Sequence, residues 1–416
     1  MTDAATDPTT QDYAAALDAA DPLAHHRDRF VGADTDLVYF DGNSLGRPLR
    51  ETAGRLARFV EEEWGARLIR GWDERWFELP LTLGDRLGRV VLGAGPGQTV
   101  VGDSTTVLLY KLARAAVDAQ TFDDPGRREI VIDVDSFPTD RYLAEGIAAE
   151  RGLTVRWVDV DTSAGVGAAH LAAVLGPQTS LVLLSHVAYR SGHVADVAGL
   201  TRMAHDVGAL VLWDLSHSVG SVPVELDAWE VDLAAGCTYK YLNGGPGSPA
   251  FGYLTTRHQA LLTQPITGWM GHEDPFLMGP GFRPSPGVRR LLSGTPPVTG
   301  MLAMQDMLDL VEEVGITAIR AKSQRLTAYA VTLADAWLAP LGVTLASPRD
   351  PGERGGHVTL NHPAMREVTA RLWRRDVIPD YRDPHGLRVG LSPLSTSFEE
   401  VRRGMAAVRE ELEELA

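Results

Sequence analysis

An aspartate and a lysine follow two apolar segments within residues 213–248, WDLSHSVGSVPVELDAWEVDLAAGCTYKYLNGGPGS. Asp214 ends the apolar run ALVLWD, and Lys240 comes directly after the run VDLAAGCTY. A charged group at the end of a buried strand costs free energy unless it is paired or takes part in chemistry. We therefore interpret Asp214 and Lys240 as residues of a functional site.

Lysine is rare in this chain, which narrows the choice of a reactive amine. Among the 39 basic residues, three are lysines: Lys111, Lys240 and Lys322. Lys111 and Lys322 fall inside helical patterns, at positions that we expect to face solvent. Lys240 stands instead at a predicted strand end, before a glycine-rich loop, so it is the candidate for amine chemistry.

Other predicted strands also end in polar residues. From about residue 100 onward, short apolar runs alternate with helical periods, which predicts βαβ units and a mainly parallel sheet. Runs such as SLVLLSHVAY are apolar throughout, as is typical of strands buried on both faces. Ligands of open α/β sheets bind outside the carboxyl ends of the strands. We therefore expect one site, built from clusters at five predicted strand ends: Asp103–Thr106, Asp135–Asp140, Ser185–His186, Asp214–His217 and Tyr239–Lys240.

The residue types at these ends fit pyridoxal 5′-phosphate. This cofactor needs a carboxylate beside its ring nitrogen, a lysine for its aldehyde, and amides and hydroxyls at a helix start for its phosphate. Asp214, Lys240 and the segment Ser104–Thr106 supply these three kinds of group in turn. The sequence thus predicts a pyridoxal-phosphate site.

The pattern changes after a long predicted helix that carries Lys322. Beyond it, short strands at GVTLAS, HVTLNH, VIPDYR and LRVGLS are interleaved with helices. We predict three parts: an N-terminal segment 1–50 that packs with the small domain, a large cofactor-binding domain 51–318, and a smaller α+β domain 319–416.

Composition excludes several classes of protein. The net charge of −16 disfavours a nucleic-acid partner. No run approaches the roughly 20 apolar residues of a membrane span, and the acidic N-terminus lacks the apolar region of a signal peptide. The single cysteine, Cys237, favours a cytoplasmic protein and is expected in the core. The histidines show no metal-binding spacing, so no metal site is predicted.

Several longer motifs resemble those of the kynureninases, which are fold type I pyridoxal-phosphate enzymes. The resemblance extends over nearly the whole chain, and GCTYKYLNGGPGS together with GWMGH is its most specific part. The matching stretches are YFDGNSLGRP (39–48), DSTTVLLYK (103–111), SFPTDRY (136–142), WDLSHSVGSVPVEL (213–226), CTYKYLNGGPGSPAF (237–251), GWMGH (268–272), LSGTPPV (292–298) and LRVGLSPL (387–394).

The resemblance implies a role for each matching site residue. Lys240 would form the Schiff base with the cofactor, Asp214 would pair with its ring nitrogen, and Tyr239 would relay protons. The remaining cofactor-binding residues would be Thr105, Thr106, Phe137, Pro138, Thr139, Asp140, Ser185, His217, Trp269 and Thr295. The residues that border the substrate would be Arg388, at its α-carboxylate, and Trp72, His272, Asn43 and Ser44.

The resemblance also implies an activity and an assembly. The activity is hydrolysis of L-kynurenine to anthranilate and L-alanine, a step of tryptophan catabolism and of routes to NAD. The assembly is a homodimer, in which Trp269 and Thr295 come from the other subunit. Alternatives are a class V aminotransferase, a desulfurase, for which Cys237 is badly placed, and a cofactor-binding regulatory protein.

Two positions indicate which substrate is preferred. Kynureninases divide into those that favour kynurenine and those that favour its 3-hydroxy derivative. Trp72 and the pair Gly294–Thr295 resemble the bacterial type, which prefers kynurenine; the other type carries histidine and asparagine at the matching positions. We therefore expect 3-hydroxykynurenine to be a secondary substrate.

Overall fold

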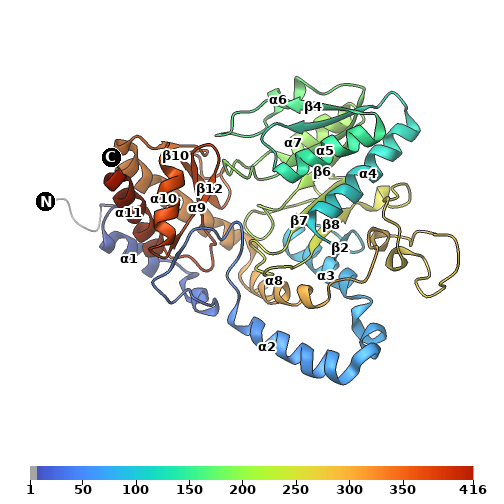
Figure 1. Cartoon of the computed structure of the whole chain (residues 1–416), viewed down its shortest axis with the longest axis horizontal. Coiled ribbons are helices and arrows are strands. Elements are labelled where there is room, and N and C mark those ends of the chain that lie inside the picture. The colour runs from blue at the N-terminus through green and yellow to red at the C-terminus, as the bar shows by residue number, and fades with distance from the viewer. Residues whose placement is uncertain (1–6, 416) are drawn as a thin grey trace.

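A seven-stranded sheet forms the centre of the larger part of the molecule (Figure 1). The computed structural model describes residues 7–415, so residues 1–6 of the predicted N-terminal segment and Ala416 lie outside it. β8 runs antiparallel to its two neighbours, and the remaining pairings are parallel. The predicted mainly parallel α/β sheet is therefore confirmed. In spatial order the strands are β2 Thr99–Gly102, β8 Ala250–Leu254, β7 Leu233–Cys237, β6 Leu210–Asp214, β5 Thr179–Ser185, β3 Glu129–Asp133 and β4 Thr154–Val158.

Helices cover both faces of this sheet because its inner strands carry apolar side chains on both sides. In β6, Leu210 and Leu212 join the core formed with α4 and α5, whereas Val211 and Trp213 join the core formed with α7 and α8. The helices of this part are α2 Arg50–Arg58, α3 Leu79–Leu87, α4 Thr105–Asp123, α5 Pro138–Arg151, α6 Ala168–Ala172, α7 Val197–Asp206 and α8 Ala303–Val314.

A smaller antiparallel sheet lies beside the large one and carries the end of the chain. Its order is β12-β13-β10-β9, with bounds Asp380–Arg382, Gly386–Gly390, His357–Asn361 and Thr344–Leu345. Its helices are α9 Ile316–Leu333, α10 Met365–Trp373 and α11 Phe398–Leu415.

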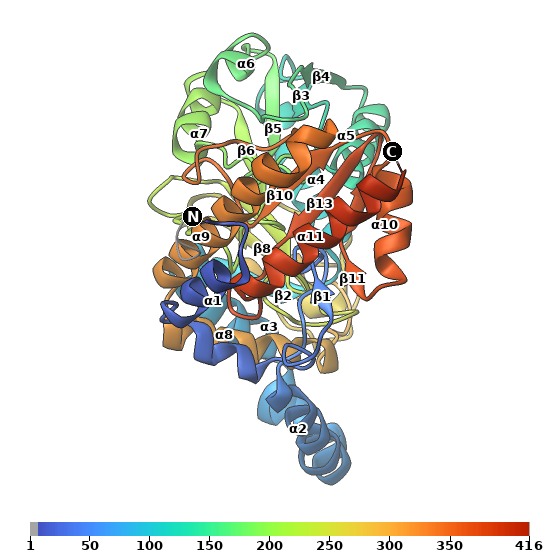
Figure 2. The ribbon, with the colours of Figure 1, turned by 90° about the vertical axis from the view of Figure 1, so that its left-hand side faces the viewer.

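The N-terminal segment packs against this smaller part. Helix α1, Gln11–Ala19, lies against α11 (Figure 2). Strand β1, Val38–Tyr39, pairs in parallel with β11, Val377–Ile378. Ala14 and Phe40 belong to the same hydrophobic core as the residues of α9 and α11. We propose on this ground that the segment and residues 319–416 fold as one unit.

The segment from α2 to residue 78 projects from the body of the protein (Figure 2). It continues α2 as short helical turns and exposes large apolar side chains, among them Trp64, Leu68 and Ile69. Exposed apolar groups in such a cluster mark a surface suited to protein contact. In the part of the chain that the structure describes, no helix is long and apolar enough to span a membrane.

The expectation that Lys111 and Lys322 face solvent is wrong. Lys111 is fully buried, and its Nζ lies 2.5 Å from Asp103 Oδ2 and donates to the Leu291 carbonyl at 2.8 Å. Lys322 is also buried, with its Nζ 2.7 Å from Asp21 Oδ2. A carboxylate partner makes burial of an ammonium group possible, and helical periodicity contains no information about a partner on another element.

Candidate active site

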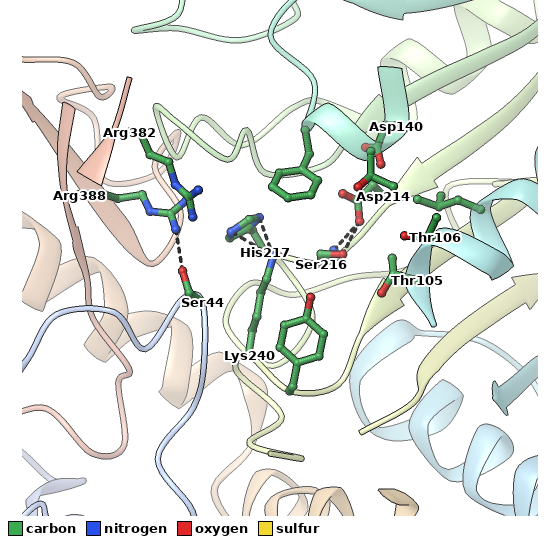
Figure 3. A pocket seen from close by; sticks show the side chains of 14 residues that line it. Ser44, Thr105, Thr106, Asp140, Asp214, Ser216, His217, Lys240, Arg382 and Arg388 are labelled. Atoms are coloured by element: carbon green, nitrogen blue, oxygen red, sulfur yellow. Dashed lines mark hydrogen bonds between the residues drawn. The ribbon is translucent and has the colours of Figure 1, made fainter. Parts of the chain in front are cut away.

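The carboxyl ends of the large sheet, the start of two helices and the small sheet enclose a pocket of about 250 Å³ (Figure 3). The pocket lies where ligands bind in open α/β sheets. Most of the predicted site residues line it, and they come from the N-terminal segment, the large part and the small part of the chain. The lining residues are Ser44, Thr105, Thr106, Leu109, Phe137, Thr139, Asp140, Asp214, Ser216, His217, Tyr239, Lys240, Arg382 and Arg388.

Lys240 follows β7 in a tight turn and directs its amine into this pocket (Figure 3). The Nζ atom lies 3.2 Å from His217 Nε2 and 5.9 Å from the centre of the Phe137 ring. Desolvation lowers the pKa of Lys240, and the positive charges of Arg388 and Arg382 lower it further, against the opposing charge of Asp214. The amine is therefore easier to deprotonate near neutral pH than a lysine in water.

His217 remains a neutral imidazole beside this amine. It is buried, and desolvation, together with the charge of Lys240, holds its pKa well below the ordinary value. The Phe137 ring packs edge-on against Tyr189, with ring centres 5.5 Å apart, which fixes its position at the pocket wall. A flat aromatic group could lie among these side chains. Because His217 is neutral, it would not add a second positive charge beside that of Lys240.

Two buried carboxyl groups stand on the opposite side of the pocket. Asp214 Oδ1 accepts hydrogen bonds from the Ser216 amide at 2.9 Å and the Ser216 hydroxyl at 2.6 Å. Desolvation raises the pKa of Asp140 well above its ordinary value, and the charges of Asp214 and Asp133 raise it further. Asp140 Oδ2 is buried without a hydrogen-bond partner among residues 7–415. Burial and the neighbouring carboxyl groups therefore favour the protonated form of Asp140.

The N-terminus of α4 brings Thr105 and Thr106 to the pocket. Ser104 caps this helix, accepting a hydrogen bond from the Val107 amide at 3.4 Å. The first amides of a helix and two hydroxyls form a site for a phosphate. The nearby carboxylate of Asp103 would repel an anion, but Lys111 neutralises it. Lys111 thus favours anion binding by neutralising Asp103, although it does not line the pocket itself.

Tyr239 and Cys237 are held in their neutral forms. Desolvation raises the pKa of the Tyr239 phenol, so this group can donate a proton but does not serve as an anion near neutral pH. Cys237 is buried, as predicted, and desolvation raises the pKa of its thiol. A thiol of this kind is a poor nucleophile.

Arg388 enters from β13 of the small sheet and is almost completely buried. It donates to the Tyr189 carbonyl and to Ser44 Oγ, both at 2.7 Å. The guanidinium thereby connects the N-terminal segment, a turn that follows β5 and the small sheet at one wall of the pocket.

Seven predicted residues do not line this pocket. Asn43 is completely buried beneath it, and Pro138 begins α5 beside it. Ser185 is paired with Asp214 in the sheet but lines a separate small cavity. The other four lie elsewhere in the same chain: Trp72 and Trp269 stand in short helical turns, and His272 and Thr295 in loops.

Three of these four residues are nevertheless close to one another. The Trp72 and Trp269 rings meet edge-on with centres 6.1 Å apart, and Trp269 and His272 line a second surface pocket of about 300 Å³. Thr295 is exposed. Trp72, Trp269, His272 and Thr295 form a second group of residues, and none of them lines the pocket that holds the Lys240 amine of their own chain.

The sequence prediction missed Leu109 and Arg382, which also line the pocket, and it included Ser216 within the cluster Asp214–His217 without giving it a role. That role could have been found, because a serine two residues after an aspartate at a strand end often closes a turn onto the carboxylate. Leu109 and Arg382 carried no such signal. Within residues 7–415, no group of three or more potential metal ligands is arranged to hold an ion.

Comparison with known proteins agrees with this arrangement. The chain is 41% identical to a kynureninase of Burkholderia pseudomallei (strain 1106a), over 97% of this chain and 96% of the relative. The chain belongs to the kynureninase family. A kynureninase of Pseudomonas fluorescens is also 41% identical, over 94% of this chain and 93% of the relative. Residues 319–408 match the family model of the kynureninase C-terminal domain. The family resemblance predicted from the motifs is thus confirmed.

Solved structures of more distant proteins share the fold. A cysteine desulfurase from Thermococcus onnurineus NA1 superposes with a TM-score of 0.80 at 17% identity, over 94% of this chain and 98% of that protein. A variant of C-DES with glycine covalently linked to its PLP cofactor superposes with a TM-score of 0.81 at 20% identity, over 92% and 99%. The predicted fold type I architecture is confirmed by these similarities.

Proposed function

We propose that this protein is a kynureninase, which hydrolyses L-kynurenine to anthranilate and L-alanine with pyridoxal 5′-phosphate. The observation that supports this most strongly is the position of the Lys240 amine. It lies in one pocket with Asp214 and the α4 N-terminus, in a chain that is 41% identical to kynureninases over nearly its full length.

The residues present fit the cofactor at each of its ends. Thr105, Thr106 and the first amides of α4 would hold the phosphate, and Asp214 would hold the proton on the ring nitrogen. Asp140 is neutral and has an unpartnered buried oxygen, so it can remain beside this proton without adding a second charge. Lys240 would hold the aldehyde carbon.

The reaction consumes one water and breaks the Cβ–Cγ bond of kynurenine. When bound, pyridoxal phosphate withdraws electrons from Cα of the amino acid and makes the neighbouring bonds reactive. Lys240, with its lowered pKa, takes the proton from Cα. Tyr239, which stays protonated, supplies a proton for the carbon that becomes the alanine methyl group. Arg388 holds the α-carboxylate, and the water oxygen ends in the carboxylate of anthranilate.

A test of cofactor use is the visible spectrum of the purified protein. Addition of pyridoxal phosphate should produce the absorbance of a lysine-linked cofactor, and L-kynurenine should then change it within the mixing time. A class V aminotransferase would respond to other amino acids and would need a keto-acid acceptor for turnover. A desulfurase needs an accessible reactive cysteine, and Cys237, the single cysteine, is buried. Desulfurase activity is therefore disfavoured.

We propose that the active form is a homodimer, in which the second group of residues completes the partner's site. Trp269 and Thr295 do not reach the pocket of their own chain, and Trp72 packs against Trp269, so the three would enter the partner's site together. The apolar surface around them supports this, since Ile69 is 76% exposed and Met278 is 75% exposed. We place this dimer in the cytosol, as a protein with one buried cysteine requires no oxidising environment.

Complementation between two inactive variants tests the shared site. Lys240→Ala mixed with Thr295→Ala should give heterodimers with one intact site, about one site in four after random exchange of subunits. Activity should therefore exceed the sum of the separate variants when the cofactor is limiting. The matched control is Lys240→Ala mixed with Asp214→Ala. Both residues belong to the part of the site that one chain supplies, so each site of the heterodimer keeps one defect. Full activity of a monomer would contradict the proposal.

The substrate preference follows from Trp72 and Thr295. An indole offers the face of a ring, so it provides no hydrogen-bond partner for the extra hydroxyl of 3-hydroxykynurenine. An unpaired hydroxyl costs roughly 1–3 kcal/mol, which corresponds to about a ten- to hundredfold lower kcat/KM. We expect wild-type protein to prefer kynurenine, and Trp72→His with Thr295→Asn to reduce the difference. Equal kcat/KM values for the two substrates in the wild type would contradict this explanation.

A further inference from the structure

Two arginines of one hairpin face the pocket from the small sheet. Arg382 lies on β12 and Arg388 on β13, and Asp380 of β12 is directly opposite Arg388 in the strand register. Asp380 Oδ2 lies 2.6 Å from Arg388 Nη2 and 2.8 Å from Arg382 Nε. One carboxylate therefore contacts both guanidinium groups, and Figure 3 shows the two side by side to the left of His217.

The two arginines differ in exposure and in how many of their hydrogen-bond donors already bind protein groups. Arg388 is 1% exposed and donates to Tyr189 and Ser44. The Arg382 side chain is 33% exposed and lines the pocket. Among residues 7–415, no hydrogen-bond partner is present for the terminal nitrogens of Arg382. The Nε atom of Arg382 lies against Asp380, and the side chain lines the pocket, so its terminal nitrogens are available to a ligand.

We propose that Arg382 is a second residue that binds the α-carboxylate of the amino-acid substrate, beside Arg388. This inference rests on the proposed function for the identity of the substrate. A carboxylate has two oxygens, and each can accept hydrogen bonds from a different guanidinium group. Asp380 pairs with both arginines, and Asp41 forms a longer ion pair with Arg388 at 3.9 Å. A substrate carboxylate would therefore be recognised by the hydrogen-bond donors that remain on Arg382 beside those of Arg388.

A different role for Arg382 makes a different prediction. Its charge also lowers the pKa of Lys240, so it could act on proton transfer and have no contact with the carboxylate. Loss of that effect would change the dependence of kcat on pH. Loss of a carboxylate contact would instead weaken the binding of amino acids and leave amines without a carboxylate unaffected.

The test compares ligands of the holoenzyme that differ only in the carboxylate. L-alanine and ethylamine are titrated into wild type and Arg382→Met, and binding is followed by the visible absorbance of the cofactor. Methionine retains the apolar stem but removes the charge-assisted hydrogen bonds. The Kd of L-alanine should rise about ten- to a hundredfold, while the Kd of ethylamine should change less than about threefold.

The control is Arg366→Met, which removes an exposed arginine near the same hairpin that pairs with Asp383 outside the pocket. It should leave both Kd values unchanged. If Arg382→Met does not fold, Arg382→Lys serves instead, since it keeps the charge and loses the two-nitrogen contact; the same preferential loss of L-alanine binding is expected.

Equal weakening of both ligands, or a shift of the kcat–pH profile with unchanged L-alanine binding, would overturn the role of Arg382. Wild-type turnover of L-kynurenine tests the proposed function separately. A protein that makes no anthranilate but shows the alanine-specific effect would refute the proposed substrate and retain the carboxylate contact. A protein that makes anthranilate but shows no alanine-specific effect would retain the proposed substrate and refute the contact.

Discussion

Lys240→Ala should abolish both the visible absorbance of the bound cofactor and turnover of L-kynurenine. The amine is the group expected to bind the aldehyde and to take the Cα proton, so kcat should fall at least about a thousandfold. Borohydride reduction of the wild-type holoenzyme, followed by peptide mapping, should place the cofactor on the peptide that contains Lys240. Label on Lys111 or Lys322 would contradict the assignment.

Lys322→Met provides the matched control for loss of a buried lysine. It leaves the buried Asp21 carboxylate without its partner, which should lower the free energy of unfolding by about 3–5 kcal/mol. Cofactor absorbance and borohydride labelling should remain, because Lys322 does not line the pocket. The two variants thus separate the loss of a catalytic amine from the loss of a structural ion pair.

Asp214→Asn should lower kcat/KM by at least about a hundredfold. The amide has the size of the carboxylate but cannot stabilise a proton on the ring nitrogen, so electrons from Cα are accepted less readily. The cofactor should bind more weakly, and its spectrum should show loss of the ring proton at lower pH than in wild type. Kinetic assays with saturating cofactor and a pH titration of the spectrum measure the two effects.

The control is Asp135→Asn, which removes a carboxylate near the end of β3, two strands away from β6 in the same sheet. Asp135 does not line the pocket, and desolvation raises its pKa to about 6, with the nearby charge of Arg190 opposing this rise. Its loss should change kcat/KM less than about threefold. Asp214→Asn with nearly normal activity would indicate that Asp140 holds the ring proton instead, and Asp140→Asn would then be the inactive variant.

The strand ends of the large sheet were predictable from sequence because their signals are local. A continuous apolar run followed by a polar cluster predicts both a buried parallel strand and the side of the sheet on which its last residue lies. Asp214, Phe137 and Thr105 are brought together in this way, from the ends of the three strands β6, β3 and β2. Their predicted roles in cofactor binding remain to be tested.

Other features depend on contacts between distant segments and left no local signal. The burial of Lys111 and Lys322 requires carboxylates from other elements, which helical periodicity does not reveal. Arg382 was one arginine among many until the register of β12 and β13 placed it beside Arg388. Trp72 and Trp269 were chosen by resemblance alone, and their place outside the pocket of their own chain leads directly to the proposed dimer.

Product analysis after incubation with L-kynurenine tests the central claim most directly. The purified protein with pyridoxal phosphate, and without any keto-acid acceptor, should release fluorescent anthranilate and L-alanine in equal amounts. Lys240→Ala, treated in parallel, should release neither. Absence of anthranilate from the active holoenzyme, or turnover that requires a keto acid, would contradict the assignment of this protein as a kynureninase.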